Sequence, residues 1–207
     1  MIGLLMSSTL PVSRVFGEEF LRVRQLALEW IRAYREYEHL RRTGDWLLAL
    51  DPEAGEPLVI AALTHDMERT VPGGPLIDKA RDAWDDLSYN TAHCARSAEV
   101  VGRWLAERGI SARFVDGIRL PILEHEFGGS PEGDLIQAAD SMSFLETNAG
   151  LVATWIARGE CSLEKGRAKL RWMCERVRIE RARETARQLY ERALAEVDRR
   201  LSEAAGA

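Results

Sequence analysis

Apolar residues recur at intervals of three and four along almost the whole chain, which is the spacing of amphipathic helices. No stretch of useful length alternates apolar and polar residues as a half-buried strand does. The pattern predicts a long first helix over residues 11–40, whose apolar face carries Phe20, Val23, Leu26, Trp30 and Tyr34. We therefore expect an all-α fold built as a helical bundle.

Turn-forming residues divide the predicted helices from one another. Residues 51–57 combine Pro, Gly and acidic side chains, so we expect a loop there, followed by a short apolar helix that leads into His65-Asp66. The run Val-Pro-Gly-Gly-Pro at 71–75 breaks the chain a second time. A weaker helical pattern follows over residues 77–86.

Two further helices are predicted from their capping residues. Ser88 or Asn90 can cap a helix that ends near Gly109, and Ser111 can cap the next one, which ends at a Gly-Gly pair. Pro121 lies inside the second of these helices and predicts a kink or a break, because proline lacks the N–H that the helix requires.

The last third of the chain contains one more apolar helix and a segment of different character. Residues 132–148 form the apolar helix, with Asp140 among its inward-facing positions. Beyond it, basic and acidic residues are interleaved around an apolar stripe. We expect residues 161–207 to form a C-terminal helical extension that packs on the domain formed by residues 1–160, and the stripe also allows a homodimer.

Composition excludes several classes of function. The chain has 207 residues, of which 46% are hydrophobic, and a net charge of -5, which argues against a nucleic-acid-binding face. No stretch reaches the roughly 20 apolar residues that span a bilayer, so we expect no membrane partner. The segment before residue 17 lacks the features of a signal peptide, and an odd number of cysteines is typical of a reducing compartment, so we expect a cytoplasmic protein.

All four histidines and two aspartates fall in predicted helices at intervals of about one helical hairpin. Imidazole and carboxylate are the side chains that bind divalent transition metals. The chain leaves no histidine for another role. We therefore predict that the metal ligands are His39, His65, Asp66, His93, His125 and Asp140.

Asp66 is the natural bridge between two ions, because a carboxylate has two oxygens and an imidazole offers one nitrogen to a metal. The other ligands then divide into two sets, with His39, His65 and Asp140 on one ion and His93 and His125 on the other. A nucleophilic hydroxide held by two metals would form near neutral pH. The nature of the metal stays open among Fe, Mn, Zn, Ni and Mg.

The order His, His-Asp, His, His, Asp on consecutive helices resembles the HD-domain superfamily of metal-dependent phosphohydrolases. The segment Ala-Ala-Leu-Thr-His-Asp at 61–66 and the apolar helix around Asp140 are similar to that family's motifs, and the resemblance covers roughly residues 20–150. Members with the two middle histidines usually bind two metals. The resemblance implies an HD-domain-like helical bundle with two divalent ions.

The resemblance implies a hydrolase that cleaves a phosphate ester or anhydride of a small, nucleotide-like molecule. The same family pattern also occurs in diiron oxygenases similar to myo-inositol oxygenase, which cleave C–C or C–P bonds with dioxygen. The ligand set alone does not choose between these two chemistries. Oxygen uptake by iron-loaded protein would favour the second, and metal-dependent phosphate release would favour the first.

Residues beside the predicted ligands are candidates for catalysis and substrate binding. Arg69 stands where many two-metal members have a lysine that contacts substrate, and its planar fork suits phosphate oxygens. We predict catalytic roles for Asp66, Glu68 and Arg69, with Arg69 and Arg96 binding the substrate anion. Glu68, Glu124 and Glu126 stand beside predicted ligands, and each could orient a ligand histidine, relay a proton or be an ordinary surface residue. The alternative for Arg69 is a surface ion pair. Trp84 is the tryptophan most suited to a pocket wall.

Overall fold

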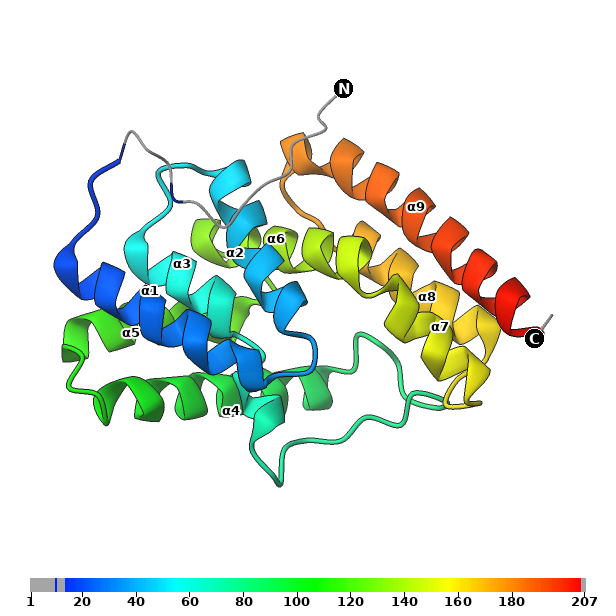
Figure 1. The fold of residues 1–207 in the computed structure, drawn as a ribbon, viewed down its shortest axis with the longest axis horizontal. Coiled ribbons are helices and arrows are strands. Elements are labelled where there is room, and N and C mark those ends of the chain that lie inside the picture. The colour runs from blue at the N-terminus through cyan, green and yellow to red at the C-terminus, as the bar shows by residue number, and fades with distance from the viewer. Residues whose placement is uncertain (1–9, 11–13, 206–207) are drawn as a thin grey trace.

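The computed structural model describes residue 10 and residues 14–205. Within these residues the chain is all-α, with nine α-helices, two short 3-10 helices and no strand (Figure 1). This confirms the predicted fold class. The elements are α1 (Glu18–Trp30), η1 (Ile31–Ala33), α2 (Tyr37–Leu50), α3 (Glu56–Thr64), η2 (Met67–Thr70), α4 (Leu87–Ala106), α5 (Ala112–Glu124), α6 (Pro131–Thr147), α7 (Ala149–Ala157), α8 (Leu163–Glu175) and α9 (Glu180–Ala205).

The prediction of one long helix over residues 11–40 is wrong, and its first three residues lie outside those described. α1 ends at Trp30, a 3-10 turn follows, and Tyr34 is extended with φ −85° and ψ 134°. The hydroxyl of Tyr34 donates a hydrogen bond to Asp66 Oδ2 at 3.3 Å. A tertiary contact therefore accompanies the break, and no Gly or Pro at this point signals it in the sequence.

The predicted helical segment over residues 77–86 is also wrong. The Asp78 carboxylate accepts a hydrogen bond from the Ala80 N–H at 2.9 Å, and the Asp82 carboxylate accepts one from the Asp78 N–H at 2.7 Å. Such local side-chain bonds compete with the helical backbone pattern. The loops predicted at residues 51–57 and 71–75 are present, apart from the start of α3 at Glu56.

The caps of the middle helices agree only in part with the prediction. Ser111 caps α5 as expected and accepts a hydrogen bond from the Phe114 N–H. α4 is capped by Asp86, whose carboxylate accepts from the Tyr89 N–H at 2.7 Å, and not by Ser88 or Asn90. The helix begins earlier than predicted because a carboxylate two residues before Ser88 already satisfies the free N–H groups of its first turn.

Pro121 does not break α5, which continues to Glu124. The proline lies in the last turn, where its missing N–H removes a single helical hydrogen bond, the one to the Gly117 carbonyl oxygen. α6 ends one residue before the predicted limit, and Ser130 caps it by accepting a hydrogen bond from the Gly133 N–H at 2.9 Å.

Two helices without an amphipathic pattern form the centre of the molecule. Every residue of α3 from Leu58 to Thr64 is buried, and α6 is buried continuously from Ile136 to Leu145. α6 packs against α2, α3 and α5 on one side and against α8 and α9 on the other. A helix covered on nearly all sides can hold a charged residue such as Asp140 away from water.

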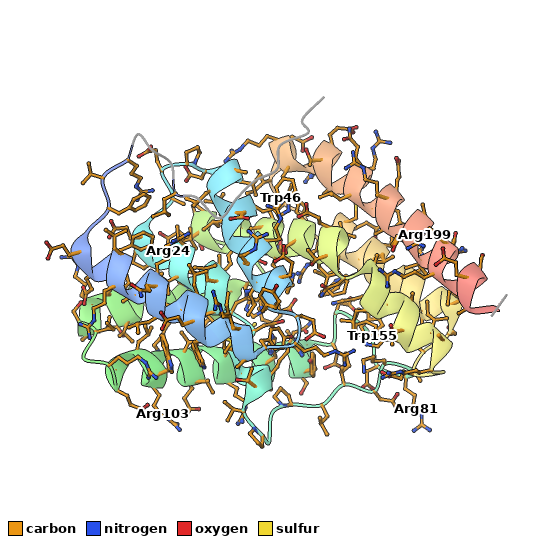
Figure 2. The ribbon with its side chains drawn as sticks, viewed as in Figure 1. Arg24, Trp46, Arg81, Arg103, Trp155 and Arg199 are labelled. Carbon is orange, nitrogen blue, oxygen red and sulfur yellow. The ribbon has the colours of Figure 1, made fainter. Side chains whose placement is uncertain are left out.

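The C-terminal helices complete a second apolar cluster beside that of α1–α6. Buried side chains from α6 and α7 meet those of α8 and α9, including Met142, Val152, Leu170, Ala186 and Val197. α9 runs along the outside of this cluster (Figure 1). The charged face of α9 points outward, as Arg199 shows in Figure 2. In residues 10 and 14–205, no helix combines the length and the apolar character needed to cross a bilayer.

Candidate metal centre

The six predicted ligands come from five helices and converge in the interior. The first turn of α2 carries His39, the end of α3 presents His65 and Asp66, and α6 carries Asp140 at its middle. α4 contributes His93, and His125 follows directly after α5. All six residues are buried, with between 0% and 9% of the surface of each residue exposed.

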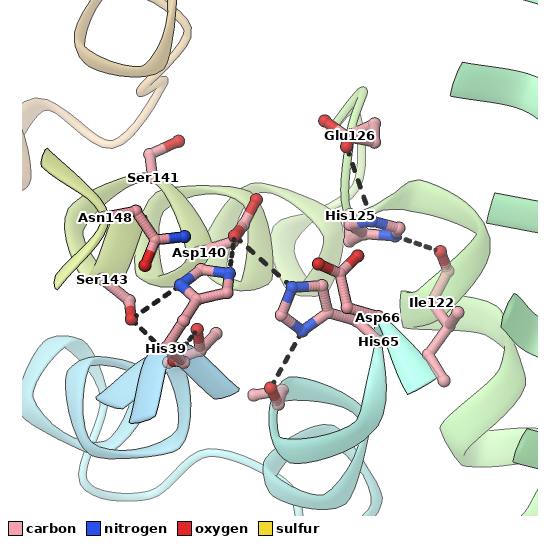
Figure 3. Close-up of polar contacts among 12 residues, drawn as sticks. His39, His65, Asp66, Ile122, His125, Glu126, Asp140, Ser141, Ser143 and Asn148 are labelled. Carbon is pink, nitrogen blue, oxygen red and sulfur yellow. Dashed lines mark hydrogen bonds and ion pairs between the residues drawn. The ribbon is translucent and has the colours of Figure 1, made fainter. Parts of the chain in front are cut away.

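Asp140 joins two of the histidines. Its Oδ1 lies 3.0 Å from His39 Nε2 and 3.4 Å from His65 Nε2 (Figure 3). The opposite nitrogen of His39 lies 3.0 Å from the Ser143 hydroxyl, which already donates its proton to the His39 carbonyl. His65 Nδ1 lies 3.0 Å from the Ala62 carbonyl oxygen, which can only accept. Both histidines therefore carry a proton on Nδ1.

The other two histidines are held in the same way. His93 Nδ1 lies 3.0 Å from Glu68 Oε1, and His125 Nδ1 lies 2.7 Å from the Ile122 carbonyl oxygen. Because both partners are acceptors, Nδ1 is again the protonated nitrogen. His93 Nε2 then faces Asp66 Oδ1 at 3.0 Å. His125 Nε2 is buried and has no hydrogen-bond partner among the described residues.

All four Nδ1 atoms are thus donors, and all four Nε2 lone pairs are available for coordination. Hydrogen bonding of Nδ1 to a carbonyl, hydroxyl or carboxylate is the usual way in which proteins orient a metal-binding histidine. Three of the lone pairs approach carboxylate oxygens, an arrangement that needs a proton or a metal cation between the two atoms. The fourth, on His125, is an unpaired acceptor inside the protein.

The electrostatics of the cluster favour a bound cation. Burial raises the pKa of Asp66, but Arg69 and the neighbouring histidines outweigh this and hold it well below its usual range. Burial lowers the pKa of His65, but Asp66 and Asp140 raise it to about 9. In the metal-free protein, a proton on His65 therefore supplies the positive charge that the carboxylates require. A divalent metal ion supplies the same charge without a proton.

Three overlapping groups of side chains bring ligand atoms within 4.8 Å of one another. They share His65 and His125, so they form one continuous cluster, in which Asp66 lies between these two histidines (Figure 3). Buried groups of this kind can hold a metal ion, and the unpaired Nε2 of His125 fits that role. The groups are His39, His65 and Asp140; His65, Asp66 and His125; and His93, His125 and Glu126.

Glu126 is the ligand-type residue that the predicted set omits. Its Oε1 lies 3.8 Å from His125 Nε2, and its other oxygen pairs with the buried guanidinium of Arg176. The sequence places Glu126 directly after His125, but acidic residues beside a histidine are common on protein surfaces. Only the turn after α5, which points Glu126 inward, distinguishes it from Glu124, which bonds the Ser130 hydroxyl instead.

Arg69 lies against the cluster and at a pocket. Its Nε is 3.1 Å from Asp66 Oδ1, and its two other nitrogens lie 2.8 Å from the Tyr89 hydroxyl and 3.3 Å from His93 Nε2. The pocket has a volume of about 680 Å³, and its walls include Arg69, Asp66, His39, Asp140 and Glu126. The cluster is therefore reached from the pocket through these side chains.

Glu68 and Arg96 lie on the far side of His93 from the pocket wall. Glu68 is buried, binds His93 through one oxygen, and accepts a hydrogen bond from Arg96 Nε at 3.1 Å through the other. Arg96 also donates to the carbonyl oxygens of Val71 and Pro72. These contacts hold His93 and the loop at Val71 and Pro72 in place. Neither Glu68 nor Arg96 lines the pocket.

Arg176, just after α8, contacts the centre from the C-terminal region, where no site residue was predicted. Its guanidinium pairs with Asp140 Oδ2 and with Glu126, and its Nε donates to the Ser141 hydroxyl at 2.8 Å. Arg176 is one of many arginines in the C-terminal region, so its inward position depends on how α8 packs. The pairing leaves Asp140 Oδ1 facing the histidines.

Comparisons with known proteins give no relative: no protein-family model, curated protein or solved structure matches this chain.

Proposed function

We propose that this protein is a divalent-metal-dependent phosphohydrolase of the HD type, acting on a phosphate ester or anhydride of a small, nucleotide-like molecule. The observation that supports it is the convergence of four Nε2 lone pairs and two ionised carboxylates on one buried cluster beside a pocket. The cluster contains all four histidines and both aspartates of the motif on which the proposed family relation rests.

Two ions would divide the ligands. His39, His65 and Asp140 would hold one, and His93 and His125 would hold the other, with Asp66 between them and Glu126 close to the second. Divalent metals bound by such sets polarise phosphoryl oxygens and make a bound water acidic enough to react near neutral pH.

The chain's own residues would bind and orient the substrate. Arg69 offers a guanidinium at the pocket wall, where it can offset charge on phosphate oxygens. Asp66 stays ionised and accepts the hydrogen bond of Tyr34, so it can take up a proton but has none to give. Glu68 would act through His93, by keeping its Nδ1 protonated and its ring fixed.

The test combines metal content with a substrate panel. Protein purified without oxygen is analysed for its elements, and phosphate release is then measured from phosphomonoesters, cyclic nucleotides and nucleoside polyphosphates with Mn²⁺ or Zn²⁺. We expect more than one metal ion per chain and phosphate release without oxygen uptake. Substrate-dependent oxygen uptake by iron-loaded protein, with no phosphate released, would replace the proposal with the diiron oxygenase. Metal content well below one ion per chain would exclude both.

A further inference from the structure

Lys169 of α8 is a cation at the pocket wall whose ammonium group lies over aromatic rings. Its Nζ lies over the ring of Trp172 at 4.2 Å, over Phe144 at 5.0 Å and over Trp84 at 5.5 Å. In the part of the chain that the structure describes, no hydrogen bond or ion pair is found for this ammonium group. Aromatic faces attract a cation but leave its three N–H groups free to donate.

The other cations that line the pocket differ from Lys169 in their partners or in their exposure. Arg69 pairs with Asp66 at 3.1 Å, Lys79 with Glu160 at 3.0 Å and Arg35 with Glu36 at 3.7 Å. Arg158 also lines the pocket, but it is exposed to solvent, whereas Lys169 is half-buried. Lys165 lies on the same helix as Lys169 and over the same Trp84 ring, at 5.6 Å, but does not line the pocket. Lys169 therefore combines access to the pocket with an unsatisfied charge.

The surroundings of Lys169 favour an incoming anion. Burial is the largest effect and lowers the pKa of its ammonium to about 8; Glu126 and Asp140 raise this pKa, whereas Arg176 and Arg69 lower it. An anion that accepts hydrogen bonds from Lys169 would replace the water that the ammonium has lost on burial.

The pocket is also larger than an inorganic anion requires. Its volume of about 680 Å³ lies within the roughly 300–1,000 Å³ typical of pockets that enclose organic ligands. Trp84 and Trp155 line it with ring centroids 6.0 Å apart, and Phe144 and Leu151 add further apolar surface. The Trp84 N–H already donates to the Lys165 carbonyl oxygen, so its ring offers the pocket apolar surface.

We propose that Lys169 is a substrate-binding residue that contacts the phosphate of an organic phosphate, whose flat organic group packs against the wall of Trp84 and Trp155. The identification of the anion as phosphate rests on the proposed function. Arg69 and Lys169 would then both bind phosphate oxygens, and the substrate class is an organic phosphate that carries an aromatic or similarly flat group.

Calorimetric titration with phenyl phosphate and methyl phosphate tests the assignment. Lys169→Met should weaken phenyl phosphate binding by about 10-fold or more, since a hydrogen bond to a charged group contributes about 1.5–3 kcal/mol. Lys165→Met is the matched control and should change the Kd by less than about 2-fold, while Lys169→Arg should retain most of the affinity. Phenyl phosphate should bind the unsubstituted protein more tightly than methyl phosphate does. Thermal unfolding verifies that each variant is folded.

Each outcome decides the assignment. Three results would overturn the role of Lys169. The affinity for phenyl phosphate could fall equally in Lys169→Met and Lys165→Met, it could stay unchanged in both variants, or the unsubstituted protein could fail to bind phenyl phosphate. Equal affinity for the two phosphates would overturn the flat-group wall. If phenyl phosphate binds in a Lys169-dependent manner but no phosphate ester or anhydride is hydrolysed, the proposed function fails while the anion contact stands. If a phosphate ester or anhydride is hydrolysed but Lys169→Met binds phenyl phosphate as tightly as the unsubstituted protein does, the proposed function stands and the anion contact fails.

Discussion

At the scale of single residues, the candidate centre depends on the protons that the four histidines carry on Nδ1. Each histidine donates its Nδ1 proton to a neighbour that accepts it, and three of these neighbours come from the same turn or an adjacent helix. Only His93 depends on a carboxylate, that of Glu68. The arrangement fixes the rings before any ligand binds, which lowers the entropic cost of binding.

Asp66→Ala should remove both metal ions, because Asp66 lies between the histidines of the two predicted sets. Elemental analysis after metal removal and reloading gives the ions bound per chain. Asp116→Ala, an exposed position on α5, is the control and should keep its full metal content. Loss of a single ion in Asp66→Ala would contradict the bridging role.

The metal-free protein should lose stability in acid through His125. Burial lowers the pKa of His125 from 6.5 to about 4, so below pH 6.5 the unfolded chain binds a proton that the folded protein rejects. The free energy of unfolding should therefore fall between pH 6.5 and pH 4, by up to about 3 kcal/mol from this residue. Urea unfolding at a series of pH values measures it. The fall should be smaller in His125→Gln, and an identical pH dependence would refute the assignment.

The convergence of the six predicted side chains could be expected from the sequence because histidine is rare in it: the chain has four histidines, and all of them lie in the cluster. Glu126 could be named only as one of three glutamates near predicted ligands, and Lys169 and Arg176 could not be found, because glutamates, lysines and arginines are abundant on helical surfaces. Their inward positions depend on helix packing and on one turn, which local sequence patterns do not encode.

At the scale of the helices, periodicity predicted the elements well where their ends carry a clear signal. α6 has Ser130 and Pro131 at its start, and its limits are correct within a residue. The break between α1 and α2 has no such signal, since Tyr34 takes its extended conformation beside a contact with Asp66. Residues 77–86 have helical spacing, but Asp78 and Asp82 bind the local backbone instead.

The packing of α8 should depend strongly on its buried leucine. Leu170 is fully buried in the second apolar cluster, so Leu170→Ala should lower the free energy of unfolding by roughly 2–5 kcal/mol. Leu163 lies on the same helix with 41% of its surface exposed, and Leu163→Ala should change it by less than about 0.5 kcal/mol. Chemical denaturation of both variants gives the comparison. Similar losses would mean that α8 is not anchored by this face.

At the scale of the whole molecule, the C-terminal helices do more than cover an apolar surface. Sequence patterns predicted that residues 161–207 pack on the preceding helices, and α8 and α9 do contact α6 and α7. The pairing of Arg176 with Asp140 and Glu126 also links this region to the candidate metal centre. The two apolar clusters therefore meet at a charged network.

Arg176→Met should destabilise the metal-free protein by about 3 kcal/mol or more, because Asp140 and Glu126 would lose their buried cation. Divalent metal should then raise the melting temperature of the variant more than that of the unsubstituted protein, since an ion can replace the missing charge.

Arg178→Met is the control for this effect. Arg178 is two residues away, more than half exposed, and 3.7 Å from Asp134, so its loss should leave both the stability and the response to metal nearly unchanged. Equal responses of the two variants to metal would show that Arg176 does not compensate the charge of the centre.

The aromatic wall of the pocket has a spectroscopic consequence. Trp84 and Trp155 line the pocket. Trp30 and Trp104 stack on each other with their ring centroids 4.2 Å apart, and neither of them lines the pocket. A molecule that enters the pocket changes the surroundings of one indole pair and leaves the other pair untouched. The intrinsic fluorescence of the unlabelled protein, which sums the emission of six tryptophans, should therefore change in part when the pocket is occupied.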